Sequence, residues 1–315
     1  MPSGRWIGPL CAVIGVLGFS FKAILIKLAY REYPVDAITL LALRMLYAAP
    51  MFVAMAVWAQ RSARATPTSR ADWLRLVWLG CVGYYLASLL DFMGLEYITA
   101  SLERLVLFLY PTIVVLFSAW LLGRPVTRRA VAALVLSYVG IAFVFWHDLR
   151  IAANAGATLT GGALVFASAI LYALYLVQAG GVIARLGSSR FIAWAMLASS
   201  VFVVAQFLLT RPLSALAVPR SIHAISVAMA IFSTVLPTWL IAESIRRMGA
   251  NAASLVGSLG PVFTIGLGAM ILGEPIHAIQ LAGAALVLGG VMLVTVKPRT
   301  TGTPAAAETK TYQNG

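Results

Sequence analysis

Two stretches of this chain, "ASLERLVLFLYPTIVVLFSAWLLGRPV" (residues 100–126) and "ANAASLVGSLGPVFTIGLGAMILGEPI" (residues 250–276), follow one pattern. Several positions are shared at a constant offset of 150 residues and without a gap: Pro111 with Pro261, Gly123-x-Pro125 with Gly273-x-Pro275, and, further along, Gly140 with Gly290. Identities in one common register argue against coincidence. The sequence therefore predicts an internal repeat, with the same proline-containing segment in each half.

The composition indicates a protein embedded in a membrane. Hydrophobic residues make up 61% of the 315 residues and charged residues only 10%, and the mean hydropathy is +0.93. A water-soluble domain of this size needs a far more charged surface. The net charge of +13 comes from basic residues that punctuate the apolar runs rather than gather on one segment. We therefore expect a lipid bilayer as partner and exclude nucleic acid.

Apolar stretches long enough to cross about 30 Å of hydrocarbon occur at ten places. We expect an all-α integral membrane protein with ten transmembrane helices, the first of them uncleaved. The expected spans are 6–28, 35–59, 72–93, 99–122, 128–147, 160–183, 190–210, 221–245, 251–272 and 276–296. They divide into a first repeat (1–150), a second repeat (151–297) and a disordered cytoplasmic tail (298–315).

The basic residues predict the orientation of these spans. With a cytoplasmic N-terminus, fifteen of the 23 lysines and arginines fall on the cytoplasmic side and five on the other. This bias places both termini in the cytoplasm. Five spans in each half make the second half enter the membrane inverted. Arg124 and Glu274 occupy the same position of the repeated turn. Their opposite charges are consistent with turns on opposite sides of the membrane. Inverted repeats are typical of secondary transporters, which bind solute between their halves.

These features resemble a known family. The two repeated stretches and the segment "LALRMLYAAP" of the second span are similar to the EamA-type transporters of the drug/metabolite transporter superfamily. The resemblance covers nearly the whole chain up to Lys297. It implies export of metabolites, amino acids or drugs across the cytoplasmic (inner) membrane. Two departures stand out, because the family usually has glutamate where Arg124 stands and a Trp-Gly pair where the first span has "GFSFK".

Ionisable residues inside a span are candidates for function, because their insertion costs about 2.5–3.5 kcal/mol or more. Lys22 lies in the outer part of the first span and has two interpretations: a cation facing an outward vestibule, or an anchor that reaches outward beside Lys27. Arg44 lies deeper, and either holds spans together or binds an anionic group through its planar fork. Both are candidate substrate-binding residues for a solute that bears a carboxylate.

Further charges lie around the outer ends of the third and fourth spans. They are Asp91, Glu96, Glu103 and Arg104. One interpretation is a solvated outer rim. The alternative is a charge network with Lys22 that titrates during transport and couples it to protons. Glu103 and Arg104 are adjacent, so on a helix they point about 100° apart and cannot form one simple pair.

Aromatic and amide side chains suggest where a solute is contacted. Tyr172, Tyr175 and Gln178 recur every three residues and share a helical face, which suits either a pore lining or ordinary packing between helices. Trp239 in the eighth span is a further candidate for substrate contact. Pro111 and Pro261 leave a carbonyl without its partner inside a span, so we expect them to act as hinges.

Several function classes have no support in the sequence. It holds no Walker A motif, no metal site and no cofactor motif, and Cys11 and Cys81 stand far apart in apolar stretches. We therefore expect no enzyme activity but a secondary transporter of a small organic solute that works by alternating access. The alternatives are an intramembrane enzyme, for which polar groups at one interface are too few, and a passive small-solute channel.

Overall fold

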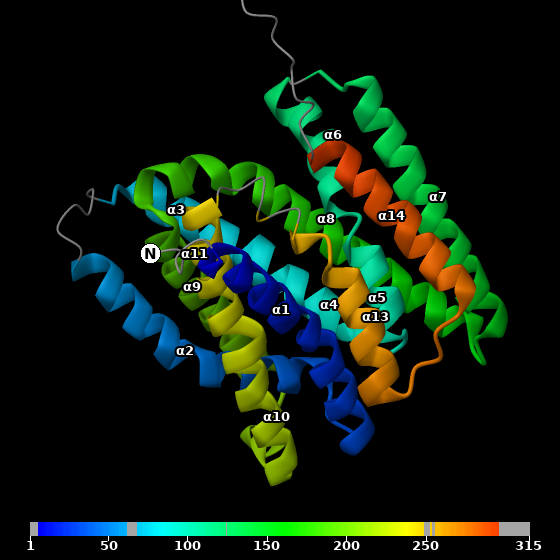
Figure 1. Ribbon diagram of the computed structural model, residues 1–315. Coiled ribbons are helices and arrows are strands. Elements are labelled where there is room, and N and C mark those ends of the chain that lie inside the picture. The colour runs from blue at the N-terminus through cyan, green and yellow to red at the C-terminus, as the bar shows by residue number, and fades with distance from the viewer. Residues whose placement is uncertain (1–5, 62–67, 124, 249–252, 254–255, 296–315) are drawn as a thin grey trace, which may run out of the picture.

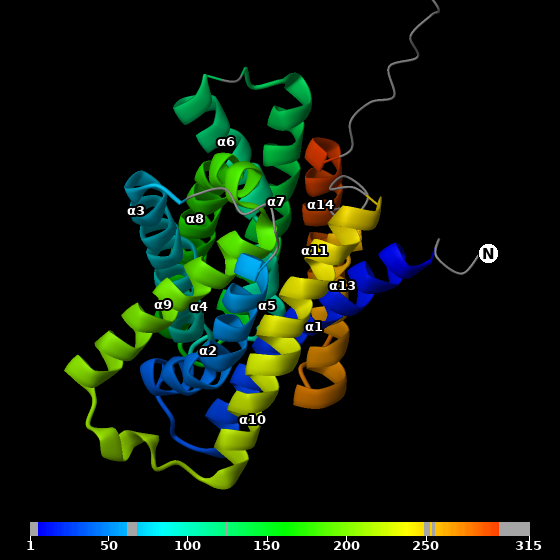
Figure 2. The ribbon, with the colours of Figure 1, turned by 90° about the vertical axis from the view of Figure 1, so that its left-hand side faces the viewer.

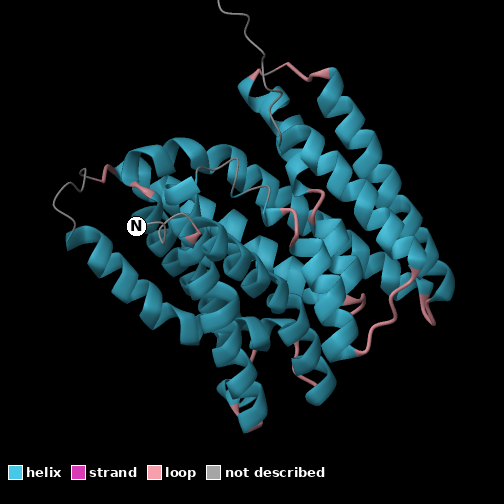
Figure 3. Cartoon of the chain, viewed as in Figure 1, coloured by secondary structure: helices cyan, strands magenta, loops and turns pink. Residues whose placement is uncertain are grey.

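The computed structural model describes residues 6–61, 68–123, 125–248, 253 and 256–295. In these ranges the chain forms helices joined by short loops and turns, and it forms no strand (Figure 3). The all-helical part of the prediction is therefore confirmed. The expected tail, residues 298–315, and Arg124 lie outside the described residues.

The helices follow one another with short connections (Figure 1). Their bounds are α1 Ile7–Glu32, α2 Ala37–Arg61, α3 Arg70–Leu79, η2 Gly80–Leu86, α4 Ala87–Leu95, α5 Ala100–Leu107, α6 Tyr110–Leu122, α7 Arg128–Ile151, α8 Ala155–Leu186, α9 Ser188–Thr210, η3 Leu213–Leu216, α10 Arg220–Ala230, η4 Ile231–Val235, α11 Leu236–Met248, α13 Gly260–Leu267, η5 Gly268–Leu272 and α14 Ala278–Thr295. Of the short segments, η2, η4 and η5 are π-helical and η3 is a 3₁₀-helix.

Eight helices in the described ranges are long and apolar enough to cross a membrane. They coincide with the first eight expected spans. Three of them are continuous runs of shorter segments: α3–η2–α4, α5–α6 and α10–η4–α11. The last two expected spans are present as shorter apolar helices, Gly260–Leu272 and Ala278–Leu293. Part of the expected ninth span, residues 251, 252, 254 and 255, lies outside the described residues.

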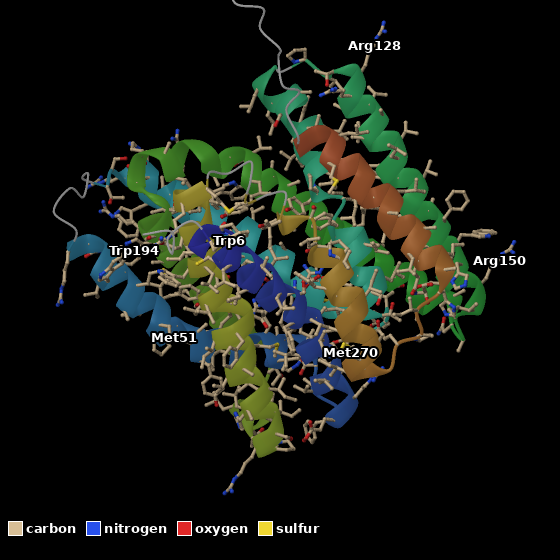
Figure 4. The ribbon with its side chains drawn as sticks, viewed as in Figure 1. Trp6, Met51, Arg128, Arg150, Trp194 and Met270 are labelled. Atoms are coloured by element: carbon tan, nitrogen blue, oxygen red, sulfur yellow. The ribbon has the colours of Figure 1, made fainter. Side chains whose placement is uncertain are left out.

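The bundle has two chemically different ends. We call basic end the one that holds the α2–α3, α6–α7 and α8–α9 connections, with basic residues such as Arg70, Arg128 and Arg190. The acidic end holds the α1–α2, α4–α5, α7–α8 and η5–α14 connections, with Asp36 and Glu96 among others. Figure 4 shows Arg128 and Arg150 extending from the two opposite ends of α7.

Backbone features recur at the offset of 150 residues. Helices α6 and α13 both begin one residue before a proline, after Leu109 (φ −73°, ψ −14°) and Leu259 (φ −73°, ψ −10°). Both end in a left-handed glycine, Gly123 (φ 62°) and Gly273 (φ 65°), a conformation that glycine adopts without steric cost. Helix breaks therefore lie directly before Pro111 and Pro261, and their role as hinges stays a prediction.

Helices from the two halves of the chain pack on one another. The largest contacts join α7 with α14, α2 with α9, α1 with α11 and α4 with α8. Figures 1 and 2 both show α7 beside α14. The interior of the molecule therefore lies between first-half and second-half helices, where substrate sites of repeat-built transporters are formed.

The contact between α7 and α14 depends on glycines. A Cβ atom on Gly290 would lie 2.6 Å from the Ala133 carbonyl oxygen and closer still to Ser137 Oγ. We expect Gly290→Leu to lower the free energy of unfolding by about 1–3 kcal/mol, because overpacking forces the two helices apart. Thermal unfolding in detergent measures this. Gly289→Leu is the matched control, since nothing lies within 4 Å of that position; equal loss in both variants would contradict the prediction.

Candidate functional site

Three buried charged side chains and one partly buried lysine meet where α1, α4 and α5 pack together. We call them the charge cluster: Asp91, Glu103, Arg104 and Lys22. Lys22 Nζ lies 2.6 Å from Asp91 Oδ2 and 3.8 Å from Glu103 Oε1. Arg104 Nε lies 4.0 Å from Glu103 Oε2. The side chain of Glu103 is 0% exposed. Charges this deeply buried are costly unless they are paired.

The direction in which the Lys22 side chain points distinguishes between the two interpretations given above. Its ammonium group points to the Asp91 carboxylate and not toward the end of α1, and its side chain is 17% exposed. Lys27 has a separate role, because its Nζ donates to the Leu95 carbonyl oxygen at 3.0 Å. Lys22 lies ten residues before the end of α1, about 15 Å along the helix. The structure therefore places Lys22 within the bundle as part of a charged site.

Arg104 connects the charge cluster to the second half of the chain. Its Nε donates to Thr264 Oγ1 on α13 at 3.0 Å, and its Nη2 donates to the Phe19 carbonyl oxygen on α1 at 2.6 Å. The 4.0 Å separation from Glu103 is long for an ion pair, as expected for adjacent residues on one helix. The cluster thus lies at the junction of three first-half helices with α13.

The carboxylates of the charge cluster are incompletely hydrogen-bonded. Asp91 Oδ1 and both oxygens of Glu103 have no N–H or O–H donor among the described residues. The two carboxyl groups lie close enough to share a hydrogen bond when one of them holds a proton. Buried polar atoms are nearly always satisfied, so such a group calls for an explanation. Three acceptor oxygens of the Asp91–Glu103 pair thus remain without a donor among the described residues.

Arg44 lies near the charge cluster, but its contacts are with an aromatic ring and a hydroxyl group. Its guanidinium stands 4.8 Å from the centre of the Phe92 ring, and its Nη2 donates to Ser88 Oγ at 3.3 Å. Its Nε is buried and has no hydrogen-bond partner among the described residues. Asp91 lies within electrostatic range of it. Arg44 therefore links α2 to α4, and its buried Nε–H has no acceptor among the described residues.

Two of the candidate aromatic residues belong to a tyrosine cluster, which we define as Tyr84, Tyr110, Tyr172 and Tyr175. The hydroxyl groups of Tyr84 and Tyr175 are hydrogen-bonded at 2.8 Å. The Tyr172 ring packs between Tyr110, at 5.1 Å, and Tyr175, at 5.6 Å, between ring centres. Tyr110 lies within electrostatic range of Arg104. The tyrosine cluster therefore continues from the charge cluster along α8 toward the basic end.

The remaining candidates lie apart from both clusters. Gln178 accepts a hydrogen bond from Trp78 Nε1 at 3.1 Å and lines a cavity of about 380 Å³ near the basic end, together with Arg75, Leu121 and Val182. Trp239 is 51% exposed on α11 and forms no ring contact among the described aromatic residues. The structure thus does not bring Trp239 to the site.

Glu96 is also separate from the charge cluster. Its Oε1 accepts a hydrogen bond at 3.0 Å from the backbone N–H of Ala37, at the start of α2. Burial raises the pKa of Glu96, the Ala37 N–H opposes this rise, and the nearby Asp36 carboxylate adds to it. Burial also acts to raise the pKa of Asp36, but hydrogen bonds from Thr39 and Arg211 lower it overall. Glu96 therefore supports the α1–α2 connection.

Three polar residues near the site are not among the predicted site residues, although Glu274 was considered for its place in the repeated turn. Thr264, the partner of Arg104, is a fully buried hydroxyl in an otherwise apolar stretch. Tyr84 follows a glycine whose added Cβ would overlap the Tyr175 ring. Glu274 is 7% exposed and accepts hydrogen bonds from the start of α5. A buried polar group amid apolar neighbours is the signal for Thr264, whereas its partner is set by tertiary packing alone.

Comparison with known proteins identifies the family of the chain. The chain matches the EamA-like transporter family over residues 6–146 and 159–296. The chain belongs to this family. EamA proteins are part of the drug/metabolite transporter superfamily. The two matched segments correspond to the two halves that share the proline-containing stretch. The protein is therefore a multi-pass membrane protein of a transporter family.

Individual relatives extend over almost the full chain. "Uncharacterized transporter YcbK" of Bacillus subtilis (strain 168) is 30% identical over 296 residues, which is 91% of each protein. An "Uncharacterized transporter" of Archaeoglobus fulgidus is 23% identical over 295 residues, 91% of this chain and 97% of that protein. A solved crystal structure at 21% identity covers 93% of this chain and 97% of its own, with a TM-score of 0.64. This last similarity concerns the fold alone.

Proposed function

We propose that this protein is a secondary transporter that exports a small organic solute bearing a carboxylate, by alternating access and with proton coupling. The basic end faces the cytoplasm, as the distribution of lysine and arginine favours. The observation that carries the proposal is the buried charge cluster at the junction of the two halves. In transporters, charged groups buried within the bundle mark substrate and ion pathways.

The packing of the repeated segments supports an alternating-access mechanism. Helix α5, the half of its span nearer the acidic end, packs on α13. Helix α6, the half nearer the basic end, packs on α8, α7 and α14 instead. Figure 1 shows α6 diverging from α13. Contact between the fourth and ninth spans is therefore made by α5 and α13, toward the acidic end, which supports a carrier whose acidic end is closed in this structure.

The charge balance favours an anionic solute. The charge cluster and Arg44 together hold three basic and two acidic groups. Protonation of one carboxyl increases the excess of positive charge. A solute carboxylate offsets it, and the planar fork of an arginine suits that group. Lys22, Arg44 and Arg104 are therefore the proposed substrate-binding cations, and the tyrosine cluster offers hydrogen-bonding and ring contacts to the rest of the solute.

Transport into proteoliposomes tests the proposal. A thermal-shift screen of the purified protein against metabolites, amino acids and drugs first selects a solute that raises the unfolding temperature. Uptake of that solute is then measured with and without an imposed proton gradient. We expect saturable uptake that the gradient accelerates. Unsaturable flux that ignores the gradient would contradict a coupled carrier and favour a passive channel. Chemical change of the solute would favour an intramembrane enzyme.

A further inference from the structure

Glu274, in the turn between η5 and α14, binds the start of a helix from the other half of the chain. Its Oε1 accepts from the Ala100 N–H at 2.8 Å, and its Oε2 accepts from the Ser101 N–H at 3.2 Å and from Ser101 Oγ at 2.8 Å. These N–H groups belong to the first turn of α5 and have no partner within the helix. A carboxylate at this point also interacts favourably with the helix dipole.

Glycine at position 268 makes room for this carboxylate. A Cβ atom built on Gly268 would lie 2.9 Å from Glu274 Oε2, closer than side-chain carbons approach oxygen. The turn itself is closed by a hydrogen bond from the Glu274 N–H to the Gly268 carbonyl oxygen at 3.1 Å. The absence of a side chain at Gly268 therefore leaves the space through which the Glu274 carboxylate reaches the start of α5.

Helix α5 is held by the ninth span at a second point. One turn after Ser101, Arg104 donates to Thr264 on α13. Between these points α5 carries Glu103, which faces Lys22. We call the two contacts the α5 clasp: Glu274 on Ala100 and Ser101, and Thr264 on Arg104. Separation of α5 from α13 at the acidic end breaks both contacts and moves two members of the charge cluster.

We propose that Glu274 is a positioning residue for transport: by capping α5 across the two halves, it holds the acidic end closed and fixes Glu103 and Arg104 against Lys22. The equivalent turn of the first half carries Arg124, and a guanidinium has only donors, so it cannot cap a helix N-terminus. Of the two repeated turns, only the one at the acidic end carries a capping carboxylate. We expect this difference to favour the state in which the acidic end is closed.

Thiol labelling tests the clasp without knowledge of the solute. The chain has only two cysteines, and Cys11→Ala with Cys81→Ala removes them. Ala100→Cys then reports on the acidic end, where position 100 is 0% exposed beneath Glu274. Gly181→Cys reports on the cavity near the basic end. The protein is reconstituted in nanodiscs, where a charged methanethiosulfonate reaches both faces.

We expect Glu274→Gln and Gly268→Ala each to accelerate labelling of Ala100→Cys about tenfold, the factor that corresponds to about 1.4 kcal/mol of lost capping. Gly268→Ala keeps the carboxylate and displaces it. Glu32→Gln is the matched control, because Glu32 is an exposed carboxylate at the same end. Unchanged labelling in folded Glu274→Gln protein, with only a lower unfolding temperature, would overturn the proposal and leave a purely stabilising cap.

The clasp rests on the proposed alternating access, and the second reporter separates the two ideas. Slower labelling of Gly181→Cys in Glu274→Gln, together with faster labelling of Ala100→Cys, supports both the clasp and alternating access. Faster labelling of Ala100→Cys with no change at Gly181→Cys supports the clasp and contradicts alternating access.

Discussion

Replacement of Lys22 by methionine will abolish transport and lower the free energy of unfolding by about 3–5 kcal/mol, because it leaves two buried carboxylates without their closest cation. Lys22 Nζ lies 2.6 Å from Asp91 and 3.8 Å from Glu103, and both carboxylates are almost fully buried. Methionine keeps the length and apolar stem of lysine, so lost packing contributes little. Thermal unfolding in detergent and solute uptake in proteoliposomes measure the two effects.

Lys27→Met is the matched control for this variant. Lys27 stands on the same helix and donates to one carbonyl oxygen, that of Leu95, so its loss should cost only about 0.5–1.5 kcal/mol. A double variant, Lys22→Met with Asp91→Asn, should recover part of the stability, because one uncompensated charge is removed with its partner, but it should not recover transport. Wild-type transport and stability in Lys22→Met would show that the lysine is merely an anchor.

The sequence predicted the local features of the fold well. Span positions follow from runs of apolar residues, and the breaks before Pro111 and Pro261 follow from the missing N–H of proline. The left-handed ends at Gly123 and Gly273 were not predicted, although glycine is the residue type that adopts this conformation without steric cost. Each of these properties depends on a few neighbouring residues, so it can be read without knowledge of what packs against the helix.

The candidate site was only partly predictable, because the sequence gives the depth of a residue better than its direction. Lys22, Asp91 and Glu103 are at a similar depth, and the structure brings them together. Glu96 lies only a few residues beyond Asp91, yet its carboxylate turns to the start of α2. The partner helices determine which way a side chain points around its helix. The pairing of α5 with α13 is a tertiary contact that neither segment alone predicts.

Replacement of Glu103 by glutamine will uncouple transport from the proton gradient while solute exchange continues. Neither carboxylate oxygen of Glu103 has a donor among the described residues, and Asp91 lies beside it. One proton on this pair supplies a single O–H···O bond between the two carboxyl groups, so we expect loading and release of that proton to follow the movement of α5. Glutamine resembles the protonated carboxyl in shape and cannot release a proton. We expect gradient-driven uptake to fall by about tenfold or more.

The control for Glu103→Gln is Glu96→Gln, which alters a carboxylate outside the charge cluster and should leave coupling intact. Exchange of labelled for unlabelled solute, without a gradient, shows whether the binding site survives in each variant. Loss of exchange together with gradient-driven uptake in Glu103→Gln would mean that this carboxylate is needed for the closed arrangement itself. Asp91→Asn would then test coupling at the carboxylate closest to Lys22. Retention of both activities would contradict a role for Glu103 in coupling, since an amide at this position cannot exchange the proton.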